Sequence, residues 1–288
     1  MSKHKKILSL TNIRKFLIWT LAILMLIFFL KITIKTYQFL KIAQHKQPTS
    51  RIQEPLSKKI QAYYYKIQPT HDSIYWFLRK AYYIFGIPKK GIIHIGARYA
   101  EELKIYKNHD IENILWIEAD PEAEIKLKQA TRNHPGSKVA MFAATDLKGP
   151  VTLRKTSNDG HSSSILKLKN HLLHYPSIVE TKTFEVSGYR LDEYLSQKEQ
   201  SKYNVLVLDV QGAELIALRG ATGMLNNVDA IIAETNYDEL YDNAVLIKDL
   251  DAFLAKHKFT RVESSSAGFY TGDALYVQDK FFKPTLEN

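Results

Sequence analysis

The hydrophobic pattern divides the chain into an apolar N-terminal run, a mixed connecting stretch and a long region of short apolar runs. Residues 16–30 contain fifteen uncharged residues, and residues 32–34 extend this run. A membrane-spanning helix needs about 20 apolar residues, and Lys31 can extend its ammonium group to the interface. We therefore expect a transmembrane helix over residues 16–34, preceded by a basic N-terminus at residues 1–15.

Two other interpretations of the apolar run are a cleaved signal peptide and a helix buried in a protein core. A signal peptide ends in small residues at its cleavage site, whereas large and basic residues (KITIKTYQFLK) follow Leu30. The sequence therefore favours a permanent single-pass anchor. The basic residues that flank the run are nearly balanced on its two sides, so they do not decide its orientation.

Residues 35–90 form a basic, Tyr-rich stretch that we assign to a linker and a juxtamembrane helix. Within it, residues 74–85 have the amphipathic pattern of a helix. The aromatic side chains of this helix either pack on the following domain or contact lipid headgroups, where aromatic rings beside basic groups are favourable. The sequence leaves both alternatives open.

From residue 91 onward, short apolar runs alternate with helical stretches, which is typical of a parallel sheet with crossover helices. The pattern predicts an α/β domain over residues 91–280 with an open, doubly wound, mostly parallel seven-stranded sheet, followed by a tail at residues 281–288. The predicted strands are Ile92–Ile95, Leu115–Glu118, Lys138–Ala143, Val205–Asp209, Ala230–Glu234, Thr260–Glu263 and Ala274–Val277. The predicted helices include Glu101–Asn108, Glu122–Thr131, Ala213–Arg219 and Ile247–His257.

A long polar stretch interrupts this alternation between the third and fourth strands. Two further strands, Val151–Arg154 and Thr183–Ser187, flank the residues from Lys155 to Thr181, and we expect them to pair. Connections of this length in compact domains are usually functional, so we expect the stretch to form a lid.

The distribution of charge argues against a nucleic-acid partner although the net charge is +10. Residues 1–90 hold 17 Lys and Arg against 2 acidic residues, whereas residues 91–288 hold 23 against 28. The basic excess therefore lies around the leader, where it suits an anionic membrane surface, and the predicted domain is mildly acidic. The absence of cysteine excludes disulfides, thiolate metal sites and a Cys nucleophile.

The candidate ligand-binding residues stand at the ends of the predicted strands, because ligands of open α/β sheets bind outside the carboxyl ends of the strands. Gly96 permits a tight turn after the first strand, beside Ala97. Glu118 ends the second strand, where a carboxylate can accept both hydroxyls of a ribose. Asp120 precedes a proline and is expected to cap the next helix. Asp146 follows the third strand and either bonds an adenine amino group or forms a turn.

Paired carboxylates end the fourth and fifth predicted strands at Asp209 and Glu234. Such a pair can act as a base, bind substrate hydroxyls or hold a cation. An ionised carboxylate after an apolar strand is costly without a partner or water, so we favour a functional role for Asp209. The alternative is a purely structural turn, with Glu214 stabilised by the dipole of the helix that it begins.

The order of these segments resembles that of the FkbM-type methyltransferases over roughly residues 92–277. The most specific piece is LVLDVQGAELIALRGA at residues 206–221, supported by other segments in the same order. These are IIHIGARYAEEL, WIEADP, AATD, SSSIL, HLLHYP, YRLDEYL, IIAETNYDELY and DALYV. The resemblance implies a class I methyltransferase fold, S-adenosylmethionine as methyl donor, and O-methylation of an acceptor such as a sugar or lipid-linked sugar.

Carried over residue by residue, the resemblance places four groups around the donor. Gly96 and Ala97 would line its methionine end, Glu118 its ribose, Asp146 its adenine side, and Asp209 the neighbourhood of the transferred methyl group. The chain departs from many methyltransferases at two positions. His94 stands where an acidic residue is common, and Ala100 where a second glycine is common. We expect His94 to be a hydrogen-bonded strand residue.

Methyl transfer to an alcohol needs a base, and the predicted lid offers His161, His171 and His174. We select His171 as the candidate, with a carboxylate-bound divalent metal as the alternative means of activating the hydroxyl. Two rival functions are a nicotinamide-dependent oxidoreductase, whose glycine fingerprint is absent, and an inactive membrane-anchored scaffold with the same fold. Because the donor is made in the cytosol, we expect the catalytic domain to face that side of the membrane.

Overall fold

The computed structural model describes residues 73–265 and 270–282. The predicted transmembrane helix over residues 16–34, the basic N-terminus and most of the linker lie outside these described residues. Within them, no helix combines the length and apolar character that crossing a bilayer requires.

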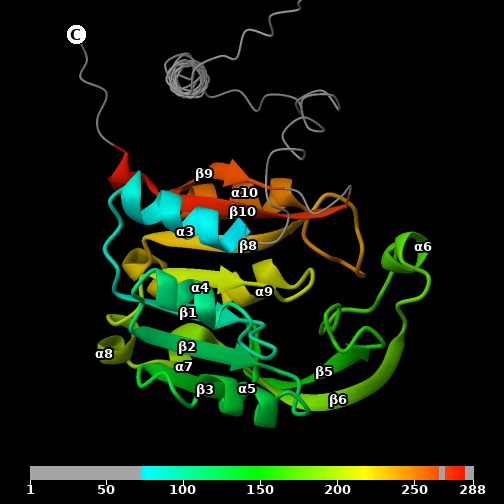
Figure 1. Ribbon diagram of the computed structural model, residues 1–288. Coiled ribbons are helices and arrows are strands. Elements are labelled where there is room, and N and C mark those ends of the chain that lie inside the picture. Colours follow the sequence, from blue (N-terminus) through cyan, green and yellow to red (C-terminus); the bar gives the residue numbers. More distant parts are fainter. Residues whose placement is uncertain (1–72, 266–269, 283–288) are drawn as a thin grey trace, which may run out of the picture. The chain divides into compact units, whose positions relative to one another are not determined.

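A seven-stranded sheet forms the centre of the described domain, with the order β3-β2-β1-β7-β8-β10-β9 (Figure 1). All neighbouring pairs on the β3 side, as far as β8, are parallel, whereas β10 is antiparallel to both β8 and β9. The predicted doubly wound, mostly parallel sheet is therefore confirmed. Its strands are β1 (Gly91–Ile95), β2 (Asn113–Glu118), β3 (Ser137–Met141), β7 (Val205–Leu208), β8 (Ala230–Asn236), β9 (Phe259–Ser264) and β10 (Thr271–Gln278).

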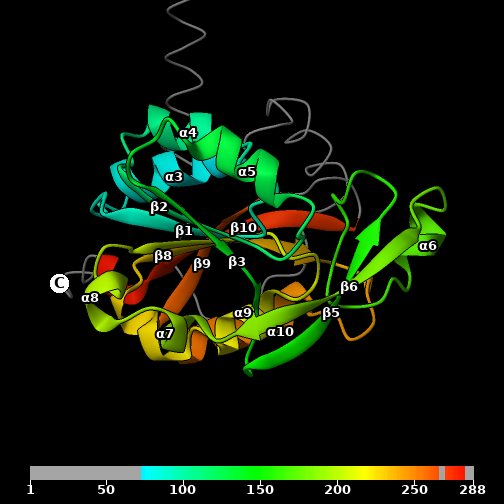
Figure 2. The same ribbon diagram turned by 90° about the horizontal axis from the view of Figure 1, so that it is seen from below.

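Helices cover both faces of the sheet, and Figure 2 shows α3, α4 and α5 on one face with α7, α9 and α10 on the other. The core alternates accordingly: Ile92 and Val207 contact one helical layer, whereas Ile93 and Leu206 contact the other. This alternation follows from the two-residue period of a strand. The helices are α3 (Ser73–Tyr83), α4 (Leu103–Asn108), α5 (Glu124–Thr131), α6 (His171–His174), α7 (Leu191–Tyr194), α8 (Gln197–Gln200), α9 (Glu214–Arg219) and α10 (Ile247–Lys256), with 3-10 helices η1 (Thr222–Asn227) and η2 (Asp279–Phe281).

The predicted amphipathic helix over residues 74–85 corresponds to α3, which packs on the domain. Phe77, Leu78 and Ala81 are buried in the core beside α4 and β10. On the outer side of the same helix, Trp76 and Tyr83 remain exposed at 44% and 60%. One face of α3 therefore packs on the domain, as the first alternative predicted, and its other face presents aromatic side chains at the surface.

The prediction of one continuous strand over Lys138–Ala143 was wrong, because the structure divides this segment between two strands. β3 ends at Met141, opposite the last residue of β2, and Phe142 then donates its backbone N–H to the Glu118 carbonyl. Because β2 offers no further partner, the chain leaves the large sheet. The short strand β4 (Ala143–Ala144) joins a second sheet with the order β4-β6-β5.

The two strands that flank the polar insertion pair as predicted. β5 (Gly149–Thr156) and β6 (Glu180–Tyr189) are antiparallel, with Leu153 opposite Phe184. Between them, residues 157–179 form the lid segment, which includes α6. Its backbone bonds to the loop after β8: Lys169 and His171 donate to the Leu240 carbonyl, and Asp242 donates to the Lys167 carbonyl.

A close backbone contact joins the ends of β1 and β7. Gly96 has a φ of +86°, and a Cβ at this position would lie 1.8 Å from the Asp209 carbonyl oxygen. On the other side, the Gly96 amide donates to the Ile117 carbonyl at 2.9 Å. Only glycine fits here, so the turn after β1 is held between the ends of two neighbouring strands.

We expect Gly96→Ala to destabilise the protein more than Gly86→Ala. Both glycines have positive φ, but a Cβ on Gly86 would meet no atom within 4 Å, so its substitution costs only the ~1–2 kcal/mol of the left-handed conformation. The backbone clash at Gly96 should add a further ~1–3 kcal/mol. Urea unfolding of the chain in mild detergent measures both values, and equal losses would contradict the proposed contact.

Candidate active site

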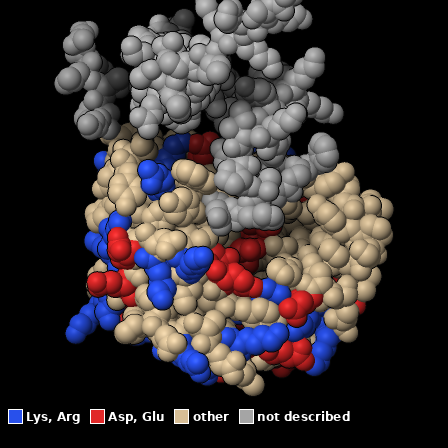
Figure 3. All heavy atoms as spheres, viewed as in Figure 1, with Lys and Arg blue, Asp and Glu red and all other residues tan. Residues whose placement is uncertain are grey.

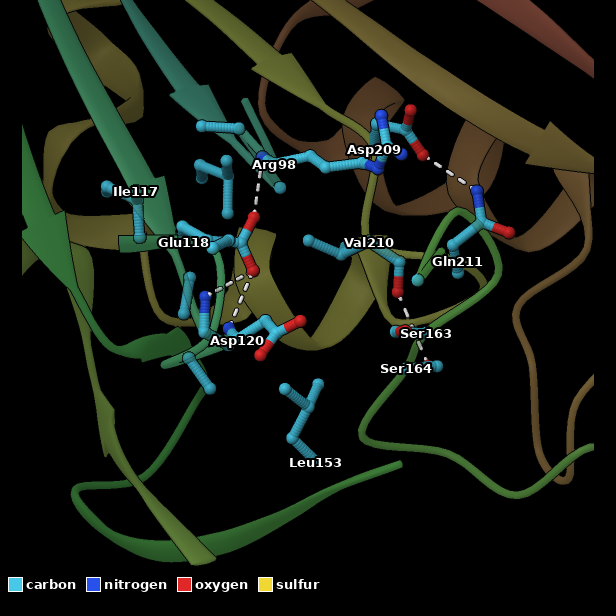
Figure 4. Close-up of a pocket in the computed structure, with 18 of the residues that line it drawn as sticks. Arg98, Ile117, Glu118, Asp120, Leu153, Ser163, Ser164, Asp209, Val210 and Gln211 are labelled. Atoms are coloured by element: carbon cyan, nitrogen blue, oxygen red, sulfur yellow. Dashed lines mark hydrogen bonds between the residues drawn. The ribbon is translucent and has the colours of Figure 1, made fainter. Parts of the chain in front are cut away.

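A cavity of about 200 Å³ opens at the carboxyl ends of β1, β2 and β7 (Figure 4). Four predicted site residues line it, namely Gly96, Ala97, Glu118 and Asp209, together with lid residues that include His161, Ser163 and Ser164. The predicted residues Asp146, Glu234 and His171 are not among its lining residues. The turns after the parallel strands thus meet the lid segment at one site.

Glu118 is held at the end of β2 by three backbone N–H groups. Arg98 donates to one carboxylate oxygen at 2.6 Å, and Ala119 and Asp120 donate to the other at 2.8 and 2.7 Å. Burial raises the pKa of Glu118, and the three hydrogen bonds oppose that rise. Each carboxylate oxygen has two lone pairs, and the oxygen that accepts only the Arg98 amide keeps one of them free for a ligand hydroxyl.

Asp120 has a different role from Glu118, as the sequence suggested. Its carboxylate accepts the backbone N–H of Glu122 at 2.8 Å and pairs with Lys155 of β5 at 2.7 Å. It therefore caps the start of the segment that leads into α5 and ties β5 to the mouth of the cavity. Glu118 and Asp120 both line the cavity.

Apolar side chains form another part of the cavity lining. They belong to Ile117, Phe142, Ala143, Ala144 and Leu153. A flat aromatic base suits such an apolar surface, and a ribose suits the Glu118 carboxylate, so these residues fit the adenosine part of S-adenosylmethionine.

Asp146 lies in the turn between β4 and β5, away from the cavity lining. Its backbone carbonyl accepts a hydrogen bond from Arg190 at 2.9 Å, and the preceding Thr145 hydroxyl donates to the Leu147 carbonyl at 2.7 Å. The structure therefore favours the turn alternative for Asp146. The chain leaves the large sheet at Phe142, and this exit directs the residue away from the site.

The turn after β1 also reaches the lid. Arg98 forms ion pairs with Glu101 and with Asp159 of the lid segment, the latter at 2.7 Å. Arg98 and Ala100 have positive φ values of 41° and 58°. Ala100 thus adopts a conformation that glycine adopts more easily, which explains why glycine is common there, and it does so without preventing the turn.

Asp209 and Glu234 end neighbouring strands, and a third side chain joins them. The amide nitrogen of Gln211 donates to Asp209 at 2.8 Å and to Glu234 at 2.6 Å. Asp209 is exposed toward the cavity, and the protein packed around its other sides raises its pKa, with Glu102 adding repulsion. Burial and the charge of Asp209 raise the pKa of Glu234 well above its usual value. No role was predicted for Gln211, because a turn residue between two carboxylates has no distinct local pattern.

Further acidic groups surround this pair, and the site carries negative charge to the extent that they are ionised. Burial raises the pKa of Glu102 and of Glu214 to about 7 and that of Asp273 to about 6. Acidic side chains gather in a hollow near the middle of the face shown in Figure 3. Such a potential favours a cationic group such as a sulfonium. Within residues 73–265 and 270–282, however, no three His, Asp or Glu side chains are arranged to bind a metal ion.

Glu214 also fulfils the structural role that the sequence allowed for it. It begins α9, and its carboxylate accepts the backbone N–H groups of Val210 and Gly212, both at 3.2 Å. It therefore holds the turn that carries Gln211. Glu214 therefore has a structural role in this turn, whereas Asp209 on the same turn lines the cavity.

His94 is a buried, hydrogen-bonded strand residue, as expected. Its Nδ1 lies 2.8 Å from the Tyr106 hydroxyl, and burial lowers its pKa to about 4, so the ring is neutral at pH 7. The imidazole contacts the Trp116 ring with centroids 5.3 Å apart. The histidine at the position where many methyltransferases have an acidic residue is thus accommodated by a buried hydrogen bond to Tyr106.

The structure does not place His171 where the predicted base would act. His171 is only 4% exposed, and its Nε2 lies 3.3 Å from the Ser162 hydroxyl while its ring contacts Tyr241. Docking of the lid on Leu240 and Tyr241 turns this face of α6 inward, away from the cavity. His174 pairs with Asp238 at 2.7 Å. Of the three candidate histidines, only His161 lines the cavity.

Comparison with known proteins assigns the family. A model described as the methyltransferase FkbM domain matches residues 94–261, more than half of the chain. The chain belongs to this family, and the predicted resemblance is confirmed. A curated relative, the 2-O-methyltransferase NoeI of Sinorhizobium fredii, is 26% identical over 138 residues. That match covers 46% of this chain and 57% of NoeI.

Solved methyltransferases are similar at lower identity. The magnesium protoporphyrin IX methyltransferase ChlM of Synechocystis PCC 6803 is 10% identical with a TM-score of 0.38, and the match covers 78% of this chain and 86% of ChlM. The methyltransferase domain of bacterial CtHen1-C is 9% identical with a TM-score of 0.40, and the match covers 70% and 96%.

The family match places the chain among the FkbM-domain methyltransferases, and the observed strand order is that of a class I methyltransferase-like sheet. The family match argues against the rival nicotinamide oxidoreductase.

We expect Glu118→Ala to weaken S-adenosylmethionine binding by ~1.5–3 kcal/mol or more, the range for hydrogen bonds to a charged group. The substitution removes the acceptor for the ribose and also frees the Arg98 amide. Calorimetric titration of the chain measures the affinity. Glu124→Ala is the matched control, because Glu124 pairs with Lys128 on the exposed side of α5. Unchanged affinity in Glu118→Ala would remove this residue from the ribose site.

Proposed function

We propose that the enzyme transfers the methyl group to a hydroxyl of a sugar, either on a glycan or on a lipid-linked acceptor. The observation that carries this proposal is the carboxylate pair Asp209 and Glu234, joined by Gln211 beside the cofactor cavity. Carboxylates are suited both to accept a hydroxyl proton and to hydrogen-bond neighbouring hydroxyls. The name of the relative NoeI, a 2-O-methyltransferase, agrees with transfer to oxygen.

Asp209 is the proposed general base. When bound, S-adenosylmethionine supplies an electrophilic methyl group on a positively charged sulfur. Asp209 lines the cavity and faces the acceptor side, and its raised pKa brings its base strength closer to that needed at neutral pH. Glu118 holds the methyl donor, and Glu234 acts on Asp209 through Gln211. A histidine base is not required, which accords with the burial of His171 against Ser162.

We expect Asp209→Asn to lower turnover by roughly 10²–10⁴-fold, the usual contribution of a general base. Affinity for S-adenosylmethionine should change far less. In the unmodified enzyme, turnover should fall as the pH decreases, because the base loses its charge, and the raised pKa places this fall above the usual range of an aspartate. An assay with labelled donor and sugar or lipid-linked sugar fractions measures both effects.

The matched control is Asp251→Asn, which removes a charge that pairs with Arg261 outside the cavity. This variant should keep its turnover. Wild-type turnover in Asp209→Asn would assign Asp209 to the structure of the turn, and label transferred to nitrogen or carbon would overturn the proposed acceptor class.

We also propose that the enzyme acts at a membrane, anchored by a helix over residues 16–34 with the catalytic domain on the cytosolic side. The uncharged run, the basic excess of residues 1–90 and the supply of donor in the cytosol support this arrangement. On α3, Trp76, Arg79 and Tyr83 are exposed at helical spacing. Amphipathic aromatic and cationic side chains of this kind suit a headgroup interface.

We expect protease added to intact cells or sealed vesicles to leave the catalytic domain undigested until the membrane is permeabilised. The physical reason is that the bilayer separates the protease from a domain on the cytosolic side. Immunoblotting against an epitope within the domain reports its survival, and a known surface protein serves as the control for protease activity. Digestion before permeabilisation would reverse the orientation.

A further inference from the structure

We propose that Gln211 is a positioning residue that couples docking of the lid segment to the charge state of Asp209 and Glu234. The proposal rests on the proposed function of these carboxylates, and it adds that the lid controls them through Tyr241. A chain of close polar contacts carries the argument. The Tyr241 hydroxyl lies within hydrogen-bond distance of the Gln211 amide oxygen and of the Ser162 carbonyl and shares its single hydrogen between these two acceptors, while the Gln211 amide nitrogen donates to the two carboxylates.

The side chain of Gln211 is fully used by these contacts. Its nitrogen has two N–H groups, one for Asp209 and one for Glu234, and its oxygen accepts the Tyr241 hydroxyl at 2.8 Å. The reverse orientation of the amide would place its oxygen against two carboxylates and its nitrogen against the hydroxyl, so the surroundings select one orientation. A half-buried amide thus bonds to two acidic groups whose charges would repel if both were ionised.

The backbone supports the same role. Gln211 has a φ of +55°, a conformation uncommon for a residue other than glycine, asparagine or aspartate. Such an outlier costs free energy and persists where the surroundings hold it. The neighbouring Gly212 would place a Cβ only 3.1 Å from the Tyr241 ring. The absence of a side chain there lets the ring lie directly against the turn that carries Gln211.

Tyr241 links this turn to the lid segment. It is 1% exposed, and its hydroxyl lies 3.2 Å from the Ser162 carbonyl. The lid reaches this point because Lys169 and His171 bond to the Leu240 carbonyl. The sequence suggested His171 as the base. In the structure its Nε2 instead lies 3.3 Å from the hydroxyl of Ser162 and supports that residue. When the lid is docked, Tyr241 and therefore Gln211 are fixed.

The two hydrogen bonds that Gln211 donates affect the pKa values of Asp209 and Glu234. Burial raises the pKa of both carboxylates, repulsion from Glu102 adds to the rise at Asp209 and repulsion from Asp209 to that at Glu234, and the hydrogen bonds from Gln211 lower both pKa values. Loss of these bonds should make the pair hold its protons to a higher pH. The other charged or titratable groups that act on the pair belong to several elements: Glu101, Glu102, His94, Glu214 and Asp273.

The experiment compares the affinities of S-adenosylmethionine and S-adenosylhomocysteine as a function of pH, by calorimetry on the chain in detergent. Only S-adenosylmethionine carries the positively charged sulfonium, so the ratio of the two affinities reports the negative charge close to the sulfur position. We expect the preference for S-adenosylmethionine to decline as the pH falls. In Gln211→Leu the midpoint should move to higher pH by about one unit, a tenfold change in the protonation equilibrium.

A second variant, Tyr241→Phe, removes one hydroxyl and keeps the ring. Its midpoint should move in the same direction, and hydrogen exchange should accelerate in residues 157–179, because the bond to Ser162 is lost. The matched control is Tyr276→Phe, since the Tyr276 hydroxyl is also buried but bonds to Asp251 at 2.8 Å, away from the cavity. This control should leave both the midpoint and the exchange of the lid unchanged.

The outcomes separate this proposal from the proposed function. An unmoved midpoint in both variants would overturn the positioning role, and unchanged exchange of the lid in Tyr241→Phe would overturn the coupling. Neither measurement contains an acceptor, so a wrong acceptor class leaves both results as they are. Conversely, wild-type turnover in Asp209→Asn would refute the base while leaving the polar contacts of Gln211 intact.

Discussion

The backbone contact between Gly96 and Asp209 is the constraint on which the site depends. It brings the ends of β1 and β7 so close that no side chain fits between them. With that spacing fixed, the turn after β1 directs the Arg98 amide to Glu118, and the turn after β7 directs Asp209 into the cavity. The Arg98 amide that contacts Glu118 and the carboxylate of Asp209 are thus positioned by the turns after the same pair of strands.

This arrangement concentrates negative charge, and the fold compensates for it with donors. Three backbone N–H groups hold Glu118, two hold Glu214, and the Gln211 amide holds Asp209 and Glu234. A buried carboxylate without such partners would take up a proton or destabilise the fold. The donors come mostly from the strand-to-helix turns, which explains why these turns contain strained positive φ values at Arg98, Ala100 and Gln211.

Local sequence patterns predicted the sheet and the carboxylates because both depend on short-range features. An apolar strand followed by an acidic turn identifies Glu118 and Asp209 without any knowledge of distant contacts. The failures involve partners far apart in the chain. The continuation of β3 stops because β2 has ended, and His171 turns inward because the lid docks on residues some 70 positions later. Gln211 was missed for the same reason, since its role depends on Glu234 and Tyr241, which follow in another strand and loop.

The charge of the site also limits the acceptor. Asp209, Glu234, Glu102 and Asp273 lie close enough to raise one another's pKa or that of a shared neighbour. A neutral hydroxyl can approach this group, and a cationic donor is attracted to it, whereas an anionic substituent next to the reacting oxygen would be repelled in a site of low dielectric. For the proposed sugar acceptor, a carboxylate or phosphate next to the reacting hydroxyl is therefore disfavoured. For the proposed lipid-linked acceptor, the same argument requires the charge of the carrier to lie several bonds away from that hydroxyl.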